Sequence, residues 1–575
     1  MFLSALEKIF RPILAQYSDT PEKFLSMLSR CADPKFGDYQ ANFAMGLAKT
    51  LGRKPRDVAE EIRAKVLESP SAVEIFASVE VAGPGFLNLK ISDSWIAQHL
   101  ENAARDERLG VPVVEQPKTI IVDYSSPNVA KPLHVGHLRS TIIGDAICRT
   151  LKFLGHHVIG DNHLGDWGTQ FGMILWGWKN FRDEAAFEKT PVEELTRLYR
   201  IAREKMDADE AIADACRKET ERLHAGDPEN RALWNRFMPL CMKDIDRIYE
   251  RLDIHFDEVL GESFYNDRLP SVVQMLRDKG LATESDGAVC VFLEGHENPM
   301  IVQKRDGAYL YATTDLATFL YRTEIHKPDA ILYVVDHRQS EHFEMLFALL
   351  QILGHNDVDL RHIRFGTVLG DDRRPFKTRS GDTVGLEGLL DEAAKRALEV
   401  LNSDSNCDIP VDERSETAER IGTAALKYAD LSQNRDSDYV FSYDKMLALN
   451  GNTATYMQYA YARVLSIFTR GGFDAAKIAQ TATLQLAHPA ERALAMELLR
   501  FGEALEGSMR DYRPNFLSAY LYELANRYSA FFENCPVLRA ESETLRDSRL
   551  LLCDLTAKTI RKGLELLGIQ VVSRM

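Results

Sequence analysis

The spacing of apolar residues along this chain predicts a first unit that mixes helices and strands. Helical spacing covers residues 2–17, 39–51 and 55–67. An alternating run over residues 73–92 follows, and it reads as two strands joined at Gly83-Pro84-Gly85. A periodicity that changes from helical to alternating within about 100 residues indicates an α+β domain.

The next part of the chain has the pattern of a parallel sheet covered by helices. Short apolar runs occur at residues 119–122 and 331–335, and each ends in a group of polar residues. Further strand-like runs begin near His156, Val289 and Asn298, and a long charge-rich helical stretch separates the first of these from the other two. Apolar strands with polar carboxyl ends are typical of open α/β sheets, which bind ligands at that edge.

From about Arg414 onward the apolar residues recur at helical spacing only. Ala-rich patterns cover residues 418–432, 453–470, 491–505 and 517–535. They predict an all-α bundle. We therefore expect an α+β N-terminal domain (residues 1–112), an α/β domain (113–410) with a helical insertion at about 181–290, and a helical-bundle C-terminal domain (411–575).

Composition narrows the class of protein. The chain of 575 residues is too long for one core, and its 45% hydrophobic and 27% charged residues are those of a soluble globular enzyme. We find no apolar run near the roughly 20 residues of a membrane helix, and the start, MFLSALEKIFRPIL, does not have the order of a secretory signal. The eight cysteines form no Cys-x-x-Cys pair, which favours structural thiols in a reducing cytoplasm over a disulfide framework or a structural metal.

The net charge of −16 does not exclude nucleic acid as a partner. Nucleic acids bind to local patches, whereas net charge describes the average field. From Tyr443 to Met575 there are 16 Lys and Arg against 14 Asp and Glu, so the acidity lies elsewhere in the chain. The C-terminal part can therefore meet RNA.

The segment Ile120–Asp145, IIVDYSSPNVAKPLHVGHLRSTIIGD, carries the clearest chemistry. It predicts a strand, a loop and a helix that begins near Pro132 and runs towards Leu154. His134 and His137 are three residues apart, so both rings can face one point on the first helical turn, and Gly136 leaves the backbone open between them. A helix N-terminus with two histidines and Lys131 nearby predicts a polyphosphate site.

These residues resemble a known family. The His-x-Gly-His tetrapeptide within S-S-P-N-x-A-K-P-x-H-x-G-H-L-R-S-T-I-I-G is similar to the first signature of class I aminoacyl-tRNA synthetases, and to the arginyl-tRNA synthetases in particular. The resemblance implies a class I catalytic domain of the Rossmann-like (HUP) kind. It also implies ATP-dependent ligation of L-arginine to tRNA(Arg) through an arginyl-adenylate, with release of AMP and pyrophosphate, and a need for tRNA during activation.

The ends of the chain carry the same resemblance. The segment CADPKFGDYQANFAMGLAK, residues 31–49, resembles the N-terminal additional domain that contacts the tRNA elbow and D-loop in that family. An amphipathic helix after a Gly-Asp turn explains its apolar spacing equally well. AALKYADLS and YMQYAYARV resemble the family's anticodon-binding domain, and the ending VVSRM resembles the family's ending.

Amino-acid activation needs alignment and charge neutralisation, because the substrate carboxylate is itself the nucleophile. His134, His137 and Lys131 suit that task, and the resemblance adds Lys377. We expect the ATP site to comprise His134, Gly136, His137 and Lys377, with Mg²⁺ arriving on ATP.

An arginine side chain requires carboxylates placed for forked hydrogen bonds. Asp123, at the end of the first strand, and Asp315, four residues after Tyr311 on a predicted helix, are the candidates. The resemblance implies an arginine pocket made of Asp123, Ser126, Asn128, Tyr311, Asp315 and Gln339, with Asn128 and Gln339 at the α-amino and carboxylate end.

The second class I signature departs from its usual form. The family of class I enzymes has Lys-Met-Ser-Lys-Ser, whereas here Lys377, Thr378 and Arg379 precede Ser380, which stands where the second lysine would be. Several arginyl-tRNA synthetases share this departure. Which cation acts in place of that lysine stays open at this point, and Lys131 is the natural substitute.

In the C-terminal bundle the resemblance implies tRNA contacts from Tyr456, Tyr459, Arg463 and Met575. Unstacked anticodon bases need aromatic platforms, although each tyrosine, Tyr461 included, could equally be a core residue of the bundle.

We therefore expect an arginine–tRNA ligase with tRNA(Arg), L-arginine and ATP as partners, acting as a cytoplasmic monomer without a metal site or a membrane segment of its own. Two other classes remain as alternatives. One is a synthetase-like binding protein that has lost catalysis, which the intact histidines oppose. The other is a small-molecule adenylyltransferase, which the length of 575 residues and the helical C-terminal part oppose.

Overall fold

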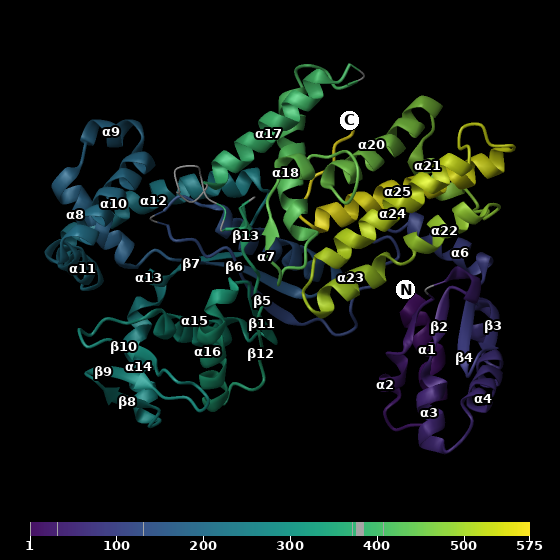
Figure 1. Ribbon diagram of the computed structural model, residues 1–575, viewed down its shortest axis with the longest axis horizontal. Helices are drawn as coiled ribbons and strands as arrows, with labels where there is room; N and C mark the ends of the chain where they lie inside the picture. Colours follow the sequence, from purple (N-terminus) through teal and green to yellow (C-terminus); the bar gives the residue numbers. More distant parts are fainter. Residues whose placement is uncertain are drawn as a thin grey trace.

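The computed structural model describes residues 2–31, 33–129, 131–370, 372–374, 376, 385–405 and 407–575, and of Pro34 only the backbone. Figure 1 shows the N-terminal domain at one end of the molecule, a group of helices at the opposite end, and a parallel sheet and a helical bundle between them. In the part of the chain so described, no helix is long and apolar enough to cross a membrane.

The N-terminal domain is a small antiparallel sheet covered by helices, as the sequence predicts. Its sheet has the order β1-β2-β4-β3. The elements are α1 (Phe2–Leu14), α2 (Pro21–Leu25), β1 (Leu28–Arg30), η1 (Pro34–Phe36), β2 (Tyr39–Ala41), α3 (Phe43–Leu51), α4 (Pro55–Leu67), α5 (Pro70–Ile75), β3 (Phe76–Ala82), β4 (Phe86–Ile91) and α6 (Asp93–Ala104). The helix predicted from Tyr39 begins only at Phe43, because residues 39–41 pair with β4.

A partly buried polar network joins this domain to the C-terminal bundle. Arg492 contacts both carboxylate oxygens of Asp38 at 2.8 Å, and the Tyr39 hydroxyl donates to Glu503 at 3.0 Å. Two parallel N–H···O bonds from one guanidinium fix orientation as well as distance. The N-terminal domain therefore has a defined position against the bundle.

The central sheet has five parallel strands in the order β12-β11-β5-β6-β7. They are β5 (Thr119–Asp123), β6 (His157–Leu164), β7 (Glu258–Gly261), β11 (Ala330–Tyr333) and β12 (Asp359–His362). The helices that cover it are α7 (Val135–Leu154), α15 (Tyr311–His326) and α16 (Ser340–Ile352), which follows η3 (His337–Gln339). The strand predicted at residues 119–122 is confirmed, and the one predicted at 331–335 is present but ends at Tyr333. The carboxyl ends of both strands lie at one edge of the sheet.

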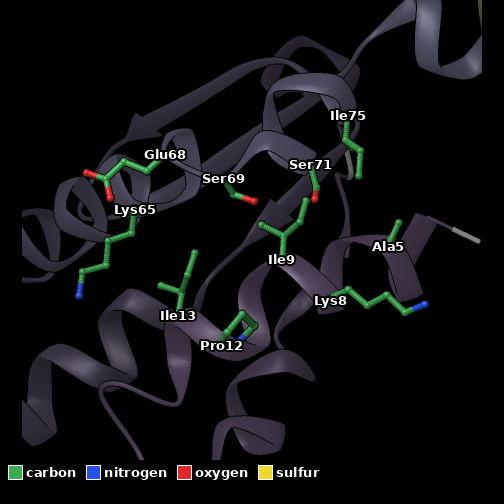
Figure 2. Close-up of a pocket in the computed structure, with 10 residues that line it drawn as sticks. All are labelled: Ala5, Lys8, Ile9, Pro12, Ile13, Lys65, Glu68, Ser69, Ser71 and Ile75. Carbon is green, nitrogen blue, oxygen red and sulfur yellow. The ribbon is translucent and has the colours of Figure 1, made fainter.

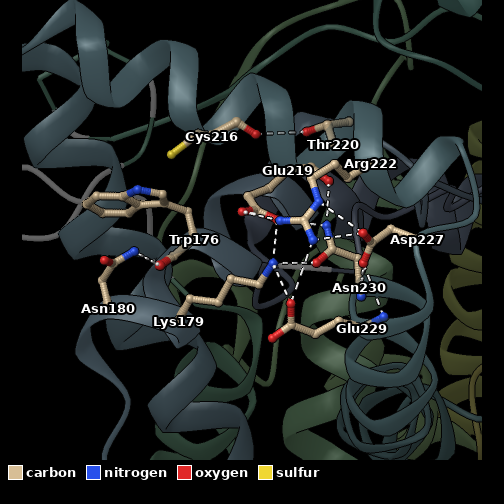
Figure 3. Close-up of polar contacts among 10 residues, drawn as sticks. All are labelled: Trp176, Lys179, Asn180, Cys216, Glu219, Thr220, Arg222, Asp227, Glu229 and Asn230. Atoms are coloured by element: carbon tan, nitrogen blue, oxygen red, sulfur yellow. Dashed lines mark hydrogen bonds and ion pairs between the residues drawn. The ribbon is translucent and has the colours of Figure 1, made fainter.

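The helical insertion lies between β6 and β7 in the chain. It consists of α8 (Thr169–Phe181), α9 (Glu184–Lys189), α10 (Pro191–Ala208), α11 (Glu210–His224) and α12 (Pro228–Arg251). Figure 3 shows the polar contacts that tie α8, α11 and α12 together. The Lys179 ammonium donates to Glu219 at 2.7 Å and to Asn230 at 2.6 Å, and Asn230 in turn donates to Glu219. A mostly buried cation with two acceptors fixes the relative position of these three helices.

A second, smaller sheet follows the helical insertion. It is antiparallel with the order β10-β9-β8 and shares a core with α15 and α16. Its elements and those leading to it are α13 (Glu262–Tyr265), η2 (Asn266–Arg268), α14 (Leu269–Asp278), β8 (Ala282–Ser285), β9 (Ala288–Val291) and β10 (Met300–Gln303).

The C-terminal part is helical, as predicted. The last elements of the α/β domain are β13 (Val368–Leu369) and α17 (Leu386–Ser403). The elements of the C-terminal part are α18 (Arg414–Leu431), β14 (Tyr439–Val440), α19 (Tyr443–Met446), α20 (Ala454–Gly471), α21 (Ala475–Thr481), α22 (Pro489–Leu498), α23 (Phe501–Arg510), α24 (Asn515–Asn534) and α25 (Glu543–Leu566). The helical pattern over residues 491–505 is divided between α22 and α23, which end and begin on either side of Leu499 and Arg500.

Helix α7 is fixed to α18 by two contacts between buried charged side chains, in which α7 supplies the cation of one and the anion of the other. Arg139 pairs with Asp430 at 2.9 Å and donates to the carbonyl of Gly366 at 2.7 Å. Two turns further on, Asp145 lies 4.0 Å from the ammonium of Lys427. Because each helix contributes one cation and one anion, only one register of the two helices satisfies both pairs.

Candidate active site

The candidate active site lies at the carboxyl edge of the parallel sheet, where three adjacent strands place polar side chains side by side. Asp123 on β5 is level with Asp161 on β6 and with Tyr333 on β11. Arg322 of α15 reaches this edge and is completely buried. Its guanidinium contacts Asp123 and Asp161 at 2.7 Å each.

This arrangement changes what Asp123 can do. Its Oδ2 atom is held by Arg322, and its Oδ1 atom accepts the hydroxyl of Ser126 at 2.9 Å. Two buried carboxylates sharing one guanidinium are stable only while the cation stays in place. Asp123 therefore supports the loop that follows β5 through an internal ion pair.

The loop between β5 and α7 has an unusual backbone. Ser125 and Ser126 have φ values of 71° and 46°, a region that non-glycine residues rarely adopt. The Ser126 N–H donates to Asn162, and Asn128 pairs with Gly165 in a parallel bridge. Left-handed non-glycine residues cost about 1–3 kcal/mol each and concentrate at functional sites.

His134 and His137 stand together at the start of α7, but the helix begins later than the sequence predicts. It starts at Val135, so His134 is its N-cap and Pro132 lies before it. The two rings stack with their centroids 3.8 Å apart. Nδ1 of His134 accepts the N–H of Gly136, and Nδ1 of His137 accepts the N–H of His134, both at 3.1 Å.

These hydrogen bonds determine what the histidines can donate. A neutral imidazole whose Nδ1 atom accepts a hydrogen bond carries its proton on Nε2. Burial and the nearby Lys131 lower the pKa of His134, and burial together with His134 and Lys131 lowers the pKa of His137 to about 3. At neutral pH both rings are therefore neutral and present an Nε2–H donor.

Lys131 and Gly136 complete this end of the site. The Lys131 ammonium lies 5.1 Å from the centre of the Tyr199 ring, which belongs to the helical insertion. A Cβ atom on Gly136 would come within 2.9 Å of the His134 ring. Glycine is thus required here by the position of the His134 side chain, beyond any need for a bare backbone facing a ligand.

The second signature lies outside the described residues. Lys377, Thr378, Arg379 and Ser380 are outside them. The first described residue after that segment, Gly385, forms a bridge with His134, and Leu386 donates its N–H to the Leu133 carbonyl at 2.9 Å. The chain therefore returns beside the first signature.

Tyr311, Asp315 and Gln339 lie on neighbouring elements of one wall. Tyr311 opens α15 and is 61% exposed, and Asp315 follows one helical turn later, as predicted. Gln339 ends η3, directly before α16. The Asp315 carboxylate receives the Nε2 donor of His342 at 2.5 Å.

Glu262, at the start of α13, is a further acidic residue near this wall that sequence reasoning missed. Its pKa is raised to about 7, first by burial and then by Asp166 and Asp315, against the opposing effect of His163. A carboxyl group whose pKa is raised towards 7 by burial and by neighbouring acidic groups is a candidate for binding a cation.

Several buried polar atoms around this edge have no hydrogen-bonding partner among the described residues. They are Asn128 Oδ1, Asp161 Oδ1, His163 Nδ1, Tyr265 Oη, Arg322 Nη1 and Tyr333 Oη. Buried polar atoms are normally paired, so their concentration at one place marks a site that a polar ligand can satisfy.

A second candidate site lies in the C-terminal bundle. A hollow of about 950 Å³ is lined by Tyr459, Arg463, Arg470, Phe532, Arg539, Arg574 and Met575, among others. Tyr459 is 42% exposed, and the Arg463 guanidinium lies 4.0 Å from the centre of the Phe532 ring. Three of the predicted residues, Tyr459, Arg463 and Met575, thus come together.

The other two tyrosines lie differently. The Tyr456 hydroxyl is engaged within the bundle, 3.3 Å from Asn526 and 3.2 Å from Ser529. Tyr461 is buried in the core, which is the alternative reading of its pattern.

A hollow of about 390 Å³ between α1 and the α4–α5 segment of the N-terminal domain contains none of the predicted site residues. Figure 2 shows that apolar side chains such as Ile9 and Ile13 form its floor and that Lys8 and Lys65 stand at its margins.

Of the residues that the sequence reasoning missed, His342 carried a signal. It stands within Asp-His-Arg-Gln-Ser-Glu-His-Phe, three residues after Gln339 and therefore one helical turn away. Glu262 and Arg322 carried none, because their roles arise from contacts across the fold.

Comparisons with known families cover almost the whole chain. The model described as "Arginyl tRNA synthetase N terminal domain" matches residues 2–91, "tRNA synthetases class I (R), catalytic domain" matches residues 99–443, and "DALR anticodon binding domain" matches residues 457–575.

Individual proteins agree with these models. The chain is similar to an arginine–tRNA ligase of Rhodopirellula baltica, with 45% identity over 100% of this chain and 99% of the relative. One of Proteus mirabilis is 46% identical over 96% of each chain. Among solved structures, the arginyl-tRNA synthetase of Thermus thermophilus has a TM-score of 0.83 at 25% identity over 100% of both chains, and that of Plasmodium falciparum has 0.80 at 31% identity over 99% of both.

Proposed function

The chain belongs to the class I arginyl-tRNA synthetases and ligates arginine to tRNA(Arg) for protein synthesis, and we propose which of its residues do so. The proposal divides the site into an ATP half at the start of α7 and an arginine half between α13, α15 and η3. The two halves meet at the carboxyl edge of the sheet, where the arginine carboxylate attacks the α-phosphate to form arginyl-adenylate and pyrophosphate leaves.

In the ATP half, His134 and His137 act as neutral hydrogen-bond donors. Both Nδ1 atoms accept backbone N–H groups, so both Nε2–H groups are available for phosphate oxygens. Neutral donors that are fixed in advance stabilise charge that grows on the phosphates, without the cost of desolvating two more cations. Lys131 and Lys377 supply the positive charge, and Gly136 leaves room for the His134 ring.

In the arginine half, Asp315 binds the guanidinium, and Tyr311 covers it. Glu262 is the second carboxylate, since it is buried close enough to Asp315 for their charges to interact. Ser126, Asn128 and Gln339 bind the α-amino and carboxylate end, and Asp123 contributes by holding Ser126. A site built on buried charged hydrogen bonds rejects a neutral isostere, because its carboxylates would be left unpaired.

Magnesium enters with ATP. Among the described residues, no group of three or more His, Cys, Asp or Glu side chains could hold a metal ion. Mg²⁺ is held mainly by nucleotide phosphates and water in such enzymes, and it would neutralise phosphate charge there. In this proposal the histidines and Lys131 orient the phosphates that carry the ion.

The hollow in the bundle is the proposed site for the anticodon. Tyr459 offers a ring for base stacking, Arg463, Arg470, Arg539 and Arg574 offer cations, and Met575 offers an apolar wall. Tyr456 supports α20 beneath this surface. We propose further that the N-terminal domain contacts the tRNA elbow and that the enzyme acts as a monomer in the cytoplasm.

The observation that carries the proposal is the pair of histidines at the start of α7, whose Nδ1 atoms both accept backbone N–H groups and leave both Nε2–H groups as donors. The test is arginine-dependent ATP–pyrophosphate exchange, with and without tRNA, together with charging assays using all twenty amino acids. We expect charging with arginine alone and exchange that depends on tRNA. Charging with another amino acid would contradict the arginine pocket, whereas strong exchange without tRNA would contradict only the tRNA requirement.

A further inference from the structure

Two helices meet at Asp315, and the contact between them involves a histidine that has no assigned role. His342 lies in the first turn of α16 and donates its Nε2–H to Asp315 Oδ2 at 2.5 Å. The side chains of His342 and Asp315 are only 11% and 24% exposed. Because both side chains are largely shielded from water, the hydrogen bond from the histidine to the carboxylate is strong and directional.

The His342 ring is itself held in place. It packs edge-on against Tyr311, with ring centroids 4.8 Å apart, and against Phe343 at 5.2 Å. It also lies one helical turn after Gln339. His342 thus contacts two residues of the arginine half on α15, and a third, Gln339, ends the η3 turn directly before its own helix.

We propose that His342 is a positioning residue that orients the Asp315 carboxylate for the substrate guanidinium. This inference rests on the proposed role of Asp315. By holding Oδ2, His342 fixes the plane of the carboxylate and leaves Oδ1, which accepts no hydrogen bond from a described residue, for the substrate. Without His342 the carboxylate can rotate about its terminal bond, which has a broad preference.

The orientation matters most for arginine. A guanidinium donates through a planar fork and needs a carboxylate in a matching plane, whereas the ammonium of lysine is a compact charge that any orientation can satisfy. His342 therefore contributes to selection for arginine as well as to its affinity. A residue that only filled space between α15 and α16 would affect neither property.

The experiment measures ATP–pyrophosphate exchange at saturating tRNA with His342→Ala and His342→Gln, varying arginine and ATP in turn. With His342→Ala we expect the KM for arginine to rise roughly tenfold or more, the usual size for a lost charged hydrogen bond, and the KM for ATP to stay near that of the wild type. His342→Gln, whose amide can donate to Oδ2, should recover part of the loss. The ratio of arginine to lysine kcat/KM should fall in His342→Ala.

His355→Ala is the matched control. The His355 ring packs edge-on against Phe319 at 4.9 Å, so it also bridges to α15, but away from Asp315. It should lower the melting temperature without changing the KM for arginine. If His342→Ala behaves in the same way as His355→Ala, the inference is overturned. A lower KM for arginine in His342→Ala would also overturn it, because His342 would then compete with the substrate for Asp315.

Asp315→Asn separates this inference from the proposed function. If Asp315→Asn raises the KM for arginine and His342→Ala does not, the proposed arginine pocket is supported and the proposed role of His342 is wrong. If Asp315→Asn leaves arginine unaffected, the pocket itself is misplaced and both fail. If both variants raise the KM for arginine, the double variant should have a KM for arginine close to that of Asp315→Asn alone, because His342 acts through Asp315.

Discussion

The edge of the parallel sheet and the hollow in the bundle place their charged residues in opposite ways. At the sheet edge the principal charged side chains are each held by another residue: Arg322 by Asp123 and Asp161, and Asp315 by His342. The His137 ring is held in the same way, because its Nδ1 atom accepts the N–H of His134. In the hollow, Arg470, Arg539 and Arg574 form no ion pair with a described residue.

This difference corresponds to two kinds of recognition. A reaction between small molecules needs donors that are fixed before the transition state forms, because reorganising them would add to the barrier. A polyanion is met by cations that remain free to follow the backbone and to release its counterions. The predictions below test that comparison, beginning with the largest expected effect.

Substitution of either histidine should test whether the fixed donors act in chemistry. His134→Ala and His137→Ala should each lower kcat roughly 10²–10³-fold with small changes in the KM for arginine. Single-turnover kinetics of adenylate formation measures this. Normal single-turnover rates with weakened binding of both substrates would show that the histidines only shape the site.

Removal of one carboxylate charge should affect arginine alone. Asp315→Asn keeps the shape of the side chain but loses a charged hydrogen bond, which we expect to cost about 1.5–3 kcal/mol in arginine kcat/KM. The KM for ATP serves as the internal reference. An equal change in both substrates would mean that the two halves of the site are not separate.

In the hollow, an exposed ring should matter more than an engaged one. Tyr459→Ala should raise the KM for tRNA by the loss of one base stack, about 1–3 kcal/mol. Tyr456→Ala, which removes a hydroxyl that already contacts Asn526 and Ser529, should act mainly on the melting temperature. Filter binding of tRNA and thermal unfolding distinguish the two. If Tyr456→Ala instead raised the KM for tRNA and Tyr459→Ala did not, Tyr456 would be the residue on which the base stacks.

The raised pKa of Glu262 should make the binding of arginine, and not that of tRNA, depend on pH near neutrality. Its pKa of about 7 means that the carboxyl group is largely protonated at pH 6 and ionised at pH 8 in the unliganded pocket. Because a guanidinium favours the ionised form, the KM for arginine should rise as the pH falls through 7, by up to about tenfold. Glu262→Gln should abolish that dependence, and the tRNA KM should not follow it.

The sequence predicted the local parts of this arrangement well. The strand at residues 119–122, the histidine pair and the helical spacing of Tyr311 and Asp315 are all consequences of neighbours within a few residues. The histidine helix begins three residues later than expected, because Asn128 and Leu133 form contacts with Gly165 and Leu386 that only the folded chain brings near.

The parts that could not be predicted depend on distant contacts. Asp123 has the position of a substrate ligand in the sequence, yet Arg322, almost 200 residues later, takes one of its oxygens. Glu262 looks like an ordinary acid at the start of a short helix, and its shifted pKa comes from burial near Asp166 and Asp315. Residues 39–41 form a strand because β4 is available to pair with them.

The crossed ion pairs between α7 and α18 have a consequence for unfolding. Separating these helices would break the fully buried Arg139–Asp430 pair, and leaving one of its charges buried without a partner costs about 3–5 kcal/mol. It would also remove Lys427 from Asp145, which keeps Arg149 of its own helix as a partner. Partial opening at this junction is therefore less favourable than losing both sides together. The catalytic fold and the bundle should melt in a single calorimetric transition, and hydrogen exchange at the centre of α7 should occur only through that common opening.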